Sequence, residues 1–219
     1  MTLDPHTVRL LRDIPLREGP VFFCDVDEVV LAFIGPYRLF LESRGMALGN
    51  GSFGLHGNVR RADGSLVDDA TVTADIDRFF ADQASWQTLV PGAREGLAAL
   101  AERGDVILLT AMWHRHLDAR AGHLAGLGLP YPLVTTEGSK GRAIAHAAGS
   151  KRAAFVDDLP RNHEDVGRHA PGATRVHFMA DRTLAPLLPP LPDGVHRAGS
   201  WPEIVDIALQ GVREPLPAH

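Results

Sequence analysis

The stretch VFFCDVDEVV, residues 21–30, indicates the fold class of this chain of 219 residues. Its first four residues are apolar, with aromatic and β-branched side chains, and acidic residues follow at once. A short apolar run that ends in polar residues is typical of a central strand of a parallel sheet, which is buried on both faces. DVILLT (105–110) and AAFVDD (153–158) repeat the pattern. We therefore predict that all three segments are central strands of one parallel sheet.

Helical patterns alternate with these strands and with two further strand-like runs, YPLVTT (131–136) and TRVHFM (174–179). The predicted helices cover 92–103, 113–127, 139–148 and 160–169. Three of them are followed by a glycine, at Gly104, Gly128 and Gly149, where a left-handed helix cap favours this residue. The alternation predicts an α/β fold, a three-layer, Rossmann-like parallel sheet with helices on both faces.

The segment 33–89 departs from this alternation. It combines a helical stretch near 36–43, a glycine-rich stretch, a hairpin signal at Asp63-Gly64 and a helix near 75–84. We interpret it as a small cap insertion after the first strand, so that 1–32 and 90–219 form the α/β core. Near the other end, the proline-rich stretch 184–194 is expected to wrap the core before a last helix at 201–210.

The composition excludes several classes of protein. Apolar residues make up 45% of the chain and charged residues 22%, which suits a globular protein rather than a disordered one. A net charge of -5 without a long basic run argues against nucleic acid as a partner. Cys24 is the only cysteine, which excludes an internal disulfide framework and a multi-cysteine zinc site. Charges scattered over residues 1–20 and the lack of a long apolar stretch predict a cytoplasmic protein outside the membrane, and the oligomeric state stays open.

Polar side chains stand at the ends of the predicted strands, where open parallel sheets bind their ligands. Asp25 and Asp27 follow the first strand and Thr110 ends the second, while Lys140 begins a helix and the pair Asp157-Asp158 ends a later strand. Two carboxylates as close as Asp25 and Asp27 can bind a hard cation, or can divide nucleophilic and proton-transfer roles between them. Taken alone, each of these residues can equally be a cap or turn former.

The order and placement of these residues resemble the four motifs of the haloacid dehalogenase-like (HAD) superfamily of phosphotransferases, from Val21 to Phe178. The resemblance implies a magnesium-dependent phosphomonoester hydrolase that acts on a small phosphorylated metabolite through an aspartyl-phosphate. Asp25 matches the nucleophile, whose carboxylate also binds Mg²⁺. Asp27 matches the general acid and base, whose backbone carbonyl binds the metal. An acid at this position favours phosphate ester hydrolysis over halide displacement.

The resemblance assigns the other motif residues as follows. Thr110 would donate its hydroxyl to the phosphoryl group, and Lys140 would neutralise charge on the nucleophile and the phosphate. Asp158 matches the metal-binding carboxylate of the fourth motif, with Asp157 as its acidic partner. Asn162, early in the next helix, is expected to help orient these aspartates. Independently of the family, two anions such as carboxylate and phosphate need cations between them in order to meet.

Residues near these motifs are candidates for contact with the substrate. Ala111 and His114 follow Thr110 closely, and we expect one or more residues of 111–114 at the mouth of the pocket. In the insertion, Arg60 could bind a remote anionic group of the substrate, as could His56 and Arg61; an exposed hairpin with ordinary solvated charge is the alternative.

Several alternatives stay open at this stage. Glu28 stands where many members of the superfamily have glycine, and it either raises the pKa of a neighbouring carboxyl or points outward. CDVDEVVLAF and FVDDLPRN resemble, more loosely, motifs of deoxyribonucleotidases, which would make the substrate a nucleotide. The fold also permits a phosphotransferase or mutase, or a non-catalytic protein that binds a phosphorylated ligand or partner.

Overall fold

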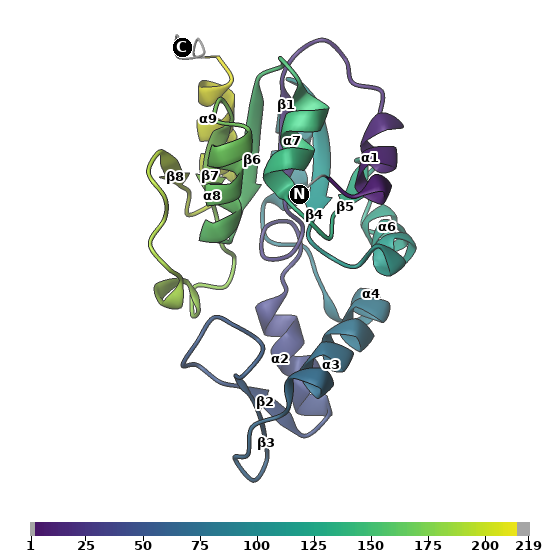
Figure 1. Ribbon diagram of the computed structural model, residues 1–219, viewed down its shortest axis with the longest axis vertical. Coiled ribbons are helices and arrows are strands. Elements are labelled where there is room, and N and C mark those ends of the chain that lie inside the picture. The colour runs from purple at the N-terminus through teal and green to yellow at the C-terminus, as the bar shows by residue number, and fades with distance from the viewer. Residues whose placement is uncertain (1–2, 214–219) are drawn as a thin grey trace.

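A six-stranded parallel sheet forms the centre of the computed structural model, which describes residues 3–213 (Figure 1). Its strand order is β5-β4-β1-β6-β7-β8. The strands are β1 (Val21–Cys24), β4 (Asp105–Thr110), β5 (Leu133–Thr135), β6 (Ala153–Asp157), β7 (Thr174–His177) and β8 (Val195–Arg197). All five predicted strands are present. The edge strand β8 was not predicted, because only Val195 is half-buried, His196 and Arg197 are exposed, and the three residues form no apolar run.

Alternate side chains of each central strand point to opposite faces of the sheet, and each face has its own apolar core. Phe22 and Cys24 belong to one core, and Val21 and Phe23 to the other. The first core is covered by α5 (Ala93–Ala101), α6 (Leu117–Gly126) and α9 (Trp201–Gly211). The second is covered by α1 (Pro5–Arg12), α7 (Lys140–Ala148) and α8 (Pro160–His169). The three-layer α/β prediction is therefore confirmed.

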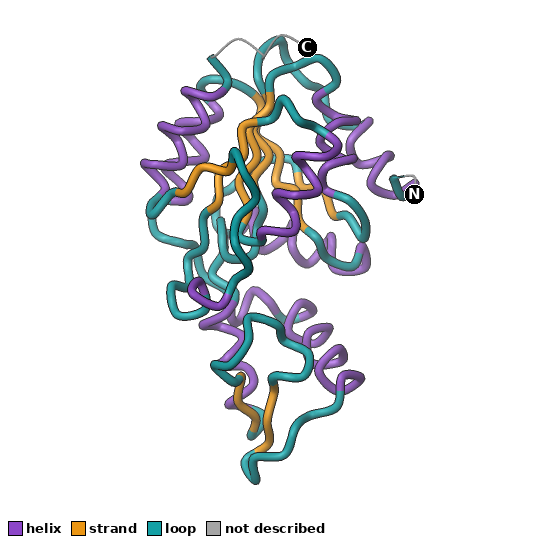
Figure 2. The backbone as a smooth tube through the Cα atoms, turned by 60° about the vertical axis from the view of Figure 1, so that its left-hand side comes forward, coloured by secondary structure: helices purple, strands orange, loops and turns teal. Residues whose placement is uncertain are grey.

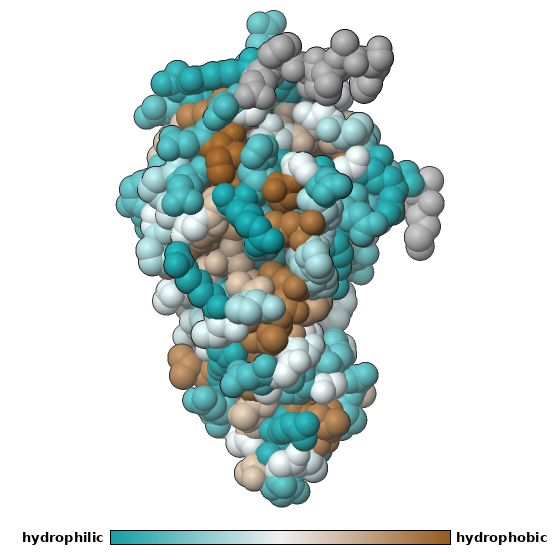
Figure 3. Space-filling view, turned by 90° about the vertical axis from the view of Figure 1, so that its left-hand side faces the viewer, coloured by the Kyte–Doolittle hydropathy of each residue, from teal (hydrophilic) through white to brown (hydrophobic). Residues whose placement is uncertain are grey.

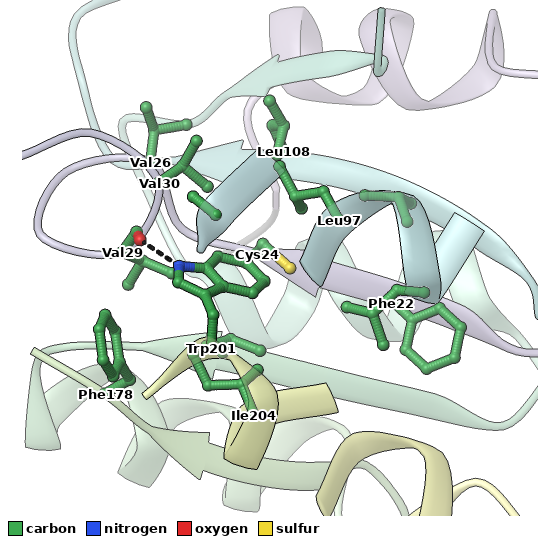
Figure 4. Close-up of a cluster of buried hydrophobic side chains, with 14 of the residues drawn as sticks. Phe22, Cys24, Val26, Val29, Val30, Leu97, Leu108, Phe178, Trp201 and Ile204 are labelled. Atoms are coloured by element: carbon green, nitrogen blue, oxygen red, sulfur yellow. Dashed lines mark hydrogen bonds between the residues drawn. The ribbon is translucent and has the colours of Figure 1, made fainter. Parts of the chain in front are cut away.

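Trp201 connects α9 to the loop that follows β1 (Figure 4). Its indole Nε1 donates a hydrogen bond to the carbonyl oxygen of Val29 at 3.0 Å, and the ring is buried among Phe22, Leu97 and Ile204. Gly96 of α5 makes this packing possible, because a Cβ there would lie 2.2 Å from Trp201 Cε3. The hydrogen bond and the packing of Trp201 therefore hold in place the loop after β1, which carries the first motif.

Helix α1 was not predicted, although its start has a recognisable signal. Asp4 caps the helix by accepting a hydrogen bond from the backbone N–H of Thr7 at 2.8 Å, and Pro5 occupies the first helical position. The predicted helix 113–127 also begins differently, as a short 3-10 turn, η1 (His114–His116), that continues into α6. None of the helices within residues 3–213 combines the length and the apolarity needed to cross a membrane.

A smaller body, which we call the α2–α4 unit (residues 34–86), lies beyond the carboxyl ends of the strands (Figures 1 and 2). Its elements are α2 (Ile34–Ser43), β2 (Met46–Leu48), β3 (Val59–Arg61), α3 (Asp69–Ala81) and α4 (Gln83–Trp86). Its core is aromatic: Tyr37 stacks on Phe33 at 5.5 Å between ring centroids, and Phe79 meets both rings edge-on. This core is separate from the two cores of the sheet.

Two predicted features of this segment differ from the structure. Gly64 does form a tight turn, with φ of 83°, and the chain pairs across it through the Arg60–Leu66 bridge and the hydrogen bond from the Val67 N–H to the carbonyl oxygen of Val59, but the strand that pairs with β3 is β2. Helix α3 begins at Asp69, earlier than the predicted 75, because Asp68 caps it through the backbone N–H of Thr71. The proline-rich stretch also differs: Leu184, beside the turn η2 (Ala185–Leu187), packs into the core of the α2–α4 unit rather than into the sheet cores.

Candidate active site

Three adjacent strands, β4, β1 and β6, bring the predicted residues together at one edge of the sheet. Cys24 pairs with Leu108 on one side and with Val156 on the other, so Asp25 and Asp157 lie at the same level and Thr110 lies one residue further along its strand. The backbone N–H of Asp25 donates to the carbonyl oxygen of Val156 at 2.9 Å, which holds the first motif against the fourth.

Lys140 joins two of these carboxylates. Its ammonium group, on an almost fully buried side chain, lies 2.8 Å from Asp25 Oδ1 and 2.6 Å from Asp157 Oδ2. Burial disfavours the charged ammonium, but Asp157 and Asp25 outweigh it and raise the pKa of Lys140. The lysine therefore stays charged and compensates part of the negative charge. It begins α7, which Ser139 caps through the backbone N–H of Arg142.

The carboxylates of Asp25, Asp157 and Asp158 form a buried group whose oxygen atoms lie within 4.8 Å of one another. Burial, with the charges of Asp157 and Asp27, raises the pKa of Asp25 to about 7 despite Lys140. Burial also raises the pKa of Asp158 well above its ordinary value, helped by Asp157 and Asp25. Ionising Asp158 therefore costs solvation free energy, and the neighbouring groups do not offset that cost.

Asp157 has the opposite environment. It accepts hydrogen bonds from Lys140, from the backbone N–H of Leu159 at 2.8 Å and from Asn162 Nδ2 at 2.8 Å. Although burial acts against ionisation, Lys140 and these donors lower the pKa of Asp157. Asn162 thus contacts Asp157 of the aspartate pair. Both carboxylate oxygens of Asp157 already accept hydrogen bonds, so the contribution of Asp157 to the site is to hold Lys140 in place.

This donor set fits a hard divalent cation. Three carboxylates and the absence of histidine or cysteine among the clustered ligands within residues 3–213 favour magnesium over a softer metal. A cation would also stabilise the ionised forms of Asp25 and Asp158, which burial disfavours. The cluster contains the predicted ligands Asp25 and Asp158. Asp27 is absent from it, and a contribution from its backbone carbonyl stays a prediction.

The carboxylate of Asp27 is held by residues that were not predicted. Arg120 of α6 donates from Nη1 and Nη2 to Asp27 Oδ1 at 3.1 Å each, and Gln87 Nε2 donates to the same oxygen at 2.8 Å. The side chain of Arg120 is 0% exposed. One signal could have found it: Arg120 lies four residues before Leu124, so the two share the buried face of the helix.

Glu28 occupies a backbone conformation that normally favours glycine, with φ of 62°. Its carboxylate accepts hydrogen bonds from the backbone N–H groups of Phe33 and Ile34, at 2.8 and 2.7 Å, and of Asp181, at 2.6 Å. The side chain is buried, so the outward orientation that was one of the two interpretations is wrong. Its charge adds only the last of several effects that raise the pKa of Asp158. Its main role is to join the start of α2 to the loop after β7.

Two buried histidines contact the backbone of the fourth motif. His163 Nε2 lies 3.0 Å from the carbonyl oxygen of Asp157, and His177 Nε2 lies 2.9 Å from that of Asp158. Burial lowers the pKa of His163 to about 4 and lowers that of His177 as well. Both rings are therefore neutral at physiological pH, and each can donate one N–H to the backbone of the aspartate pair.

A cavity of about 370 Å³ opens above these residues. Asp25, Asp27, Asp158, Thr110 and Ala111 all line it. Their juxtaposition fits what the four motifs predicted. Further lining residues come from the α2–α4 unit and from the loop after β7, so the cavity lies between the sheet edge and the smaller body.

Two predicted contacts do not reach this cavity. The ring of His114 lies between Thr135 Oγ1 and Asp4 Oδ1, at 2.7 and 3.0 Å, and ties α1 to β5. The guanidinium group of Arg60 donates to the carbonyl oxygen of Gly64 at 2.9 Å, within its own turn, and is exposed. Within residues 3–213 the basic side chains that line the cavity are His56, which was one of the three candidates in the insertion, and Arg161.

Comparison with solved structures finds the same architecture in other proteins. A HAD family hydrolase from Deinococcus radiodurans, solved with bound phosphate and sodium, is 18% identical over 89% of this chain and 97% of its own, with a TM-score of 0.57. The HAD hydrolase YfnB from Bacillus subtilis, solved bound to magnesium, is 13% identical over 88% of this chain and 100% of its own, with a TM-score of 0.57.

A third neighbour, a HAD hydrolase of family IA, variant 3, from Entamoeba histolytica, is 11% identical over 90% of this chain and 100% of its own, with a TM-score of 0.59. No family model and no curated protein matches the chain. The looser resemblance to deoxyribonucleotidases stays a prediction. At these identities the likeness is one of fold, and it agrees with the fold that the four motifs predicted. The chain has the fold of the haloacid dehalogenase-like hydrolases.

Proposed function

We propose that the protein is a magnesium-dependent phosphomonoesterase that works through a phosphorylated Asp25. The observation that carries this proposal is the contact between Lys140 and the buried carboxylates of Asp25 and Asp157, with Asp158 close by. A cluster of buried carboxylates lowers the stability of the folded protein, because buried like charges repel one another. A fold without a use for such a cluster would gain nothing in return. The cluster suits a site that receives a phosphate dianion and a metal ion.

Asp25 and Asp158 would hold the Mg²⁺. When bound, the ion would supply positive charge that lets the phosphate approach the carboxylates. Lys140 adds a second positive charge at Asp25 Oδ1. Thr110, buried at the end of β4, lines the cavity and can donate its hydroxyl to a phosphoryl oxygen. These groups offset the repulsion between a carboxylate and a phosphate, which otherwise prevents attack.

The reaction would follow two displacements. A carboxylate oxygen of Asp25 attacks phosphorus, the ester bond breaks, and Asp27 gives a proton to the leaving alcohol oxygen. Asp27 then takes a proton from water as that water attacks the phosphorus of the aspartyl-phosphate. Inorganic phosphate leaves and the Asp25 carboxylate is restored. Arg120 and Gln87 fix the Asp27 carboxylate at the cavity wall for both proton transfers.

The smaller body would act as a cap on this site. We propose that 33–89 is an insertion into a core formed by 1–32 and 90–219, and that it moves to exclude water during the first displacement. Its separate apolar core supports this division. Glu28 and Gln87 stand at its two connections to the sheet, and both also contact site residues or the loops beside them.

The alternatives predict different results. A binding protein without catalysis has no need of an acid such as Asp27 at the cavity, so its placement beside Asp25 in the same cavity favours an enzyme. A phosphotransferase would pass phosphate from Asp25 to an acceptor other than water. Equal molar release of alcohol and inorganic phosphate from a simple ester distinguishes a hydrolase from a transferase.

The direct test is phosphate release from p-nitrophenyl phosphate with and without Mg²⁺. We expect turnover that needs Mg²⁺ and that falls at least about 10³-fold in Asp25→Asn, because the nucleophile is lost. Asp13→Asn is the matched control, since the Asp13 side chain is 73% exposed and does not line the cavity. Equal turnover by the wild type and Asp25→Asn would rule out the proposed nucleophile.

A further inference from the structure

The cavity combines two kinds of wall. Its base, which we call the carboxylate floor, consists of Asp25, Asp27, Glu28 and Asp158. The opposite wall, which we call the apolar roof, comes entirely from the segment 33–89 and consists of Phe33, Ile34, Phe53, Leu55, Ile76 and Phe80. Met179 and Leu188, from the loop after β7, extend the apolar wall on one side. The phosphate would sit on the floor, so the rest of a substrate must lie against the roof.

The roof is built from well-packed side chains rather than from mobile surface groups. Phe33 and Phe80 are each at least nine-tenths buried, with ring centroids 5.8 Å apart, and both also contact Phe79. Ile76 packs against the same core and is partly exposed. Figure 3 shows apolar, brown surface on one face near the level at which the sheet core meets the α2–α4 unit. A ligand that covers the roof would remove apolar surface from water, which is favourable.

Positive charge is scarce at this cavity. Among the described residues that line it, the basic side chains are Arg161 and His56, and both are exposed at its rim. His56 Nε2 also lies 2.9 Å from Thr73 Oγ1. Lys140 is committed to Asp25 and Asp157. A second anionic group held beside the phosphate, away from Arg161 at the rim, would therefore face the carboxylate floor or the apolar roof without a partner, which is strongly unfavourable.

We infer that the substrate is the phosphate monoester of a predominantly apolar alcohol that carries no second anionic group close to the phosphate. This inference rests on the proposed hydrolase activity and adds the chemical class of the leaving group. It predicts that sugar phosphates, nucleotides and small phospho-acids are poor substrates. A phospho-acid such as phosphoglycolate would hold its carboxylate beside the phosphate, and therefore near the carboxylate floor rather than at the exposed rim where Arg161 lies.

The test compares phosphate esters of primary alcohols, whose leaving groups are chemically alike. kcat/KM is measured with Mg²⁺ for ethyl, n-butyl, n-hexyl and 2-phenylethyl phosphate, and for glycerol 1-phosphate, phosphoglycolate and a nucleoside monophosphate. We expect kcat/KM to rise about fourfold for each added methylene, the equivalent of about 0.8 kcal/mol, until the cavity is filled. 2-Phenylethyl phosphate should exceed ethyl phosphate by about 10–100-fold. A nucleotide or phosphoglycolate as the best substrate would overturn the inference.

A substitution in the apolar roof tests whether the preference for apolar esters arises from the roof. Ile76→Asn should lower kcat/KM about tenfold for 2-phenylethyl phosphate and leave ethyl phosphate within about twofold, because the latter scarcely reaches the roof. Leu39→Asn is the control: it changes an apolar residue of α2 that is 60% exposed and does not line the cavity. Phe53→Ser, in the loop between β2 and β3, repeats the test at a position whose change is least able to unfold the unit. Equal losses on both esters would contradict a specificity role.

A binding measurement separates this inference from the hydrolase proposal. Calorimetry with Mg²⁺ compares 2-phenylethylphosphonate and ethylphosphonate, which carry no bond that the enzyme can hydrolyse. Selective binding without turnover of any ester would refute the hydrolase and support the apolar class of ligand. Turnover without selectivity in either measurement would support the hydrolase and overturn the apolar class. Neither binding nor turnover would overturn both.

Discussion

The carboxylate floor and the apolar roof face each other across one cavity but are stabilised in opposite ways. The floor depends on charge: Lys140 and Arg120, both buried, contact three of the aspartates at the sheet edge. The roof depends on aromatic packing, with Phe79 at ring distances of 5.4 to 5.8 Å from four neighbouring rings. Under the proposed function, the floor would supply the chemistry and the roof the selectivity.

The two regions also differ in how well their groups are satisfied. The six side chains of the roof are apolar and carry no group that needs a charged or hydrogen-bonding partner. In the floor, burial raises the pKa values of Asp25 and Asp158, so ionising them costs free energy when no cation is bound. Natural sites accept such instability where function needs it. Changes to the floor should therefore alter stability and activity together, whereas changes to the roof should alter selectivity first.

The largest effect on stability is expected from Lys140→Met. Removing the ammonium leaves Asp25 and Asp157 without their shared cation, and breaking a buried ion pair in this way typically costs about 3–5 kcal/mol. Urea unfolding at pH 7.5 in EDTA measures the change. Lys151→Met is the matched control, because Lys151 Nζ donates an exposed hydrogen bond to the backbone carbonyl oxygen of Arg17, and its loss should cost less than about 1 kcal/mol. Similar losses in both variants would show that Lys140 does not compensate the floor.

A smaller effect is expected from Arg120→Met. Arg120 is a positioning residue that acts through Asp27, so kcat should fall about 10–100-fold, part of the 10²–10⁴ that a well-placed acid or base contributes. KM should stay within about twofold, because Arg120 does not line the cavity.

Two further variants check that interpretation. Arg120→Lys keeps the charge and should restore part of kcat, which a purely structural role in α6 would not explain. Arg115→Met, whose partner Asp77 is on the surface of α3, is the control and should leave kcat unchanged. A rise in KM with unchanged kcat in Arg120→Met would contradict the positioning role.

The smallest effect is expected from Asp158→Asn. This substitution should raise the stability of the metal-free protein, whereas most changes at the site should lower it. Without metal, the variant should melt about 2–4 °C higher than the wild type at pH 8, equivalent to about 1 kcal/mol, because it removes one of three clustered buried carboxylates. The folded-state pKa values of Asp25 and Asp158 are raised, so ionisation destabilises the wild type as pH rises from about 4 through about 7.

The difference in melting temperature should therefore vanish near pH 4. Adding Mg²⁺ should raise the melting temperature of the wild type and leave that of Asp158→Asn almost unchanged. Thermal unfolding at pH 4, 6 and 8, in EDTA and in Mg²⁺, measures all of these effects, with Asp13→Asn as the surface control. Equal stabilisation of the wild type and Asp158→Asn by Mg²⁺ would show that Asp158 is not a ligand.

Much of the floor could be predicted because a parallel sheet converts sequence position into spatial position. Residues that directly follow adjacent parallel strands meet at one edge of the sheet. Asp25, Thr110 and Asp157 each follow or end such a strand, so locating the strands was enough to bring them together. Lys140 followed from its place at the start of a helix that packs on the same sheet. The motif resemblance then assigned chemical roles to these positions.

The substrate side of the site could not be predicted in the same way. Its contacts join residues that are distant in sequence and carry no periodic signal: Gln87 is 60 residues from Asp27, Arg120 is 93 residues from it, and Glu28 is 153 residues from Asp181. Arg60 was expected to reach the substrate, but a carbonyl oxygen of its own turn binds its guanidinium group. A sequence pattern identifies a charged side chain without showing which partner captures it.

The sequence by itself determined the α/β class, the central strands and the four motif positions, because apolar periodicity and strand order are local properties of the chain. Only the tertiary structure decided what surrounds them: the clamp of Arg120 and Gln87 on Asp27, the burial of Glu28, and the apolar roof above the aspartates. These features depend on how the α2–α4 unit packs over the sheet edge. Burial and pairing energies are set by that packing, and they decide both the charge state of the floor and the kind of molecule that fits above it.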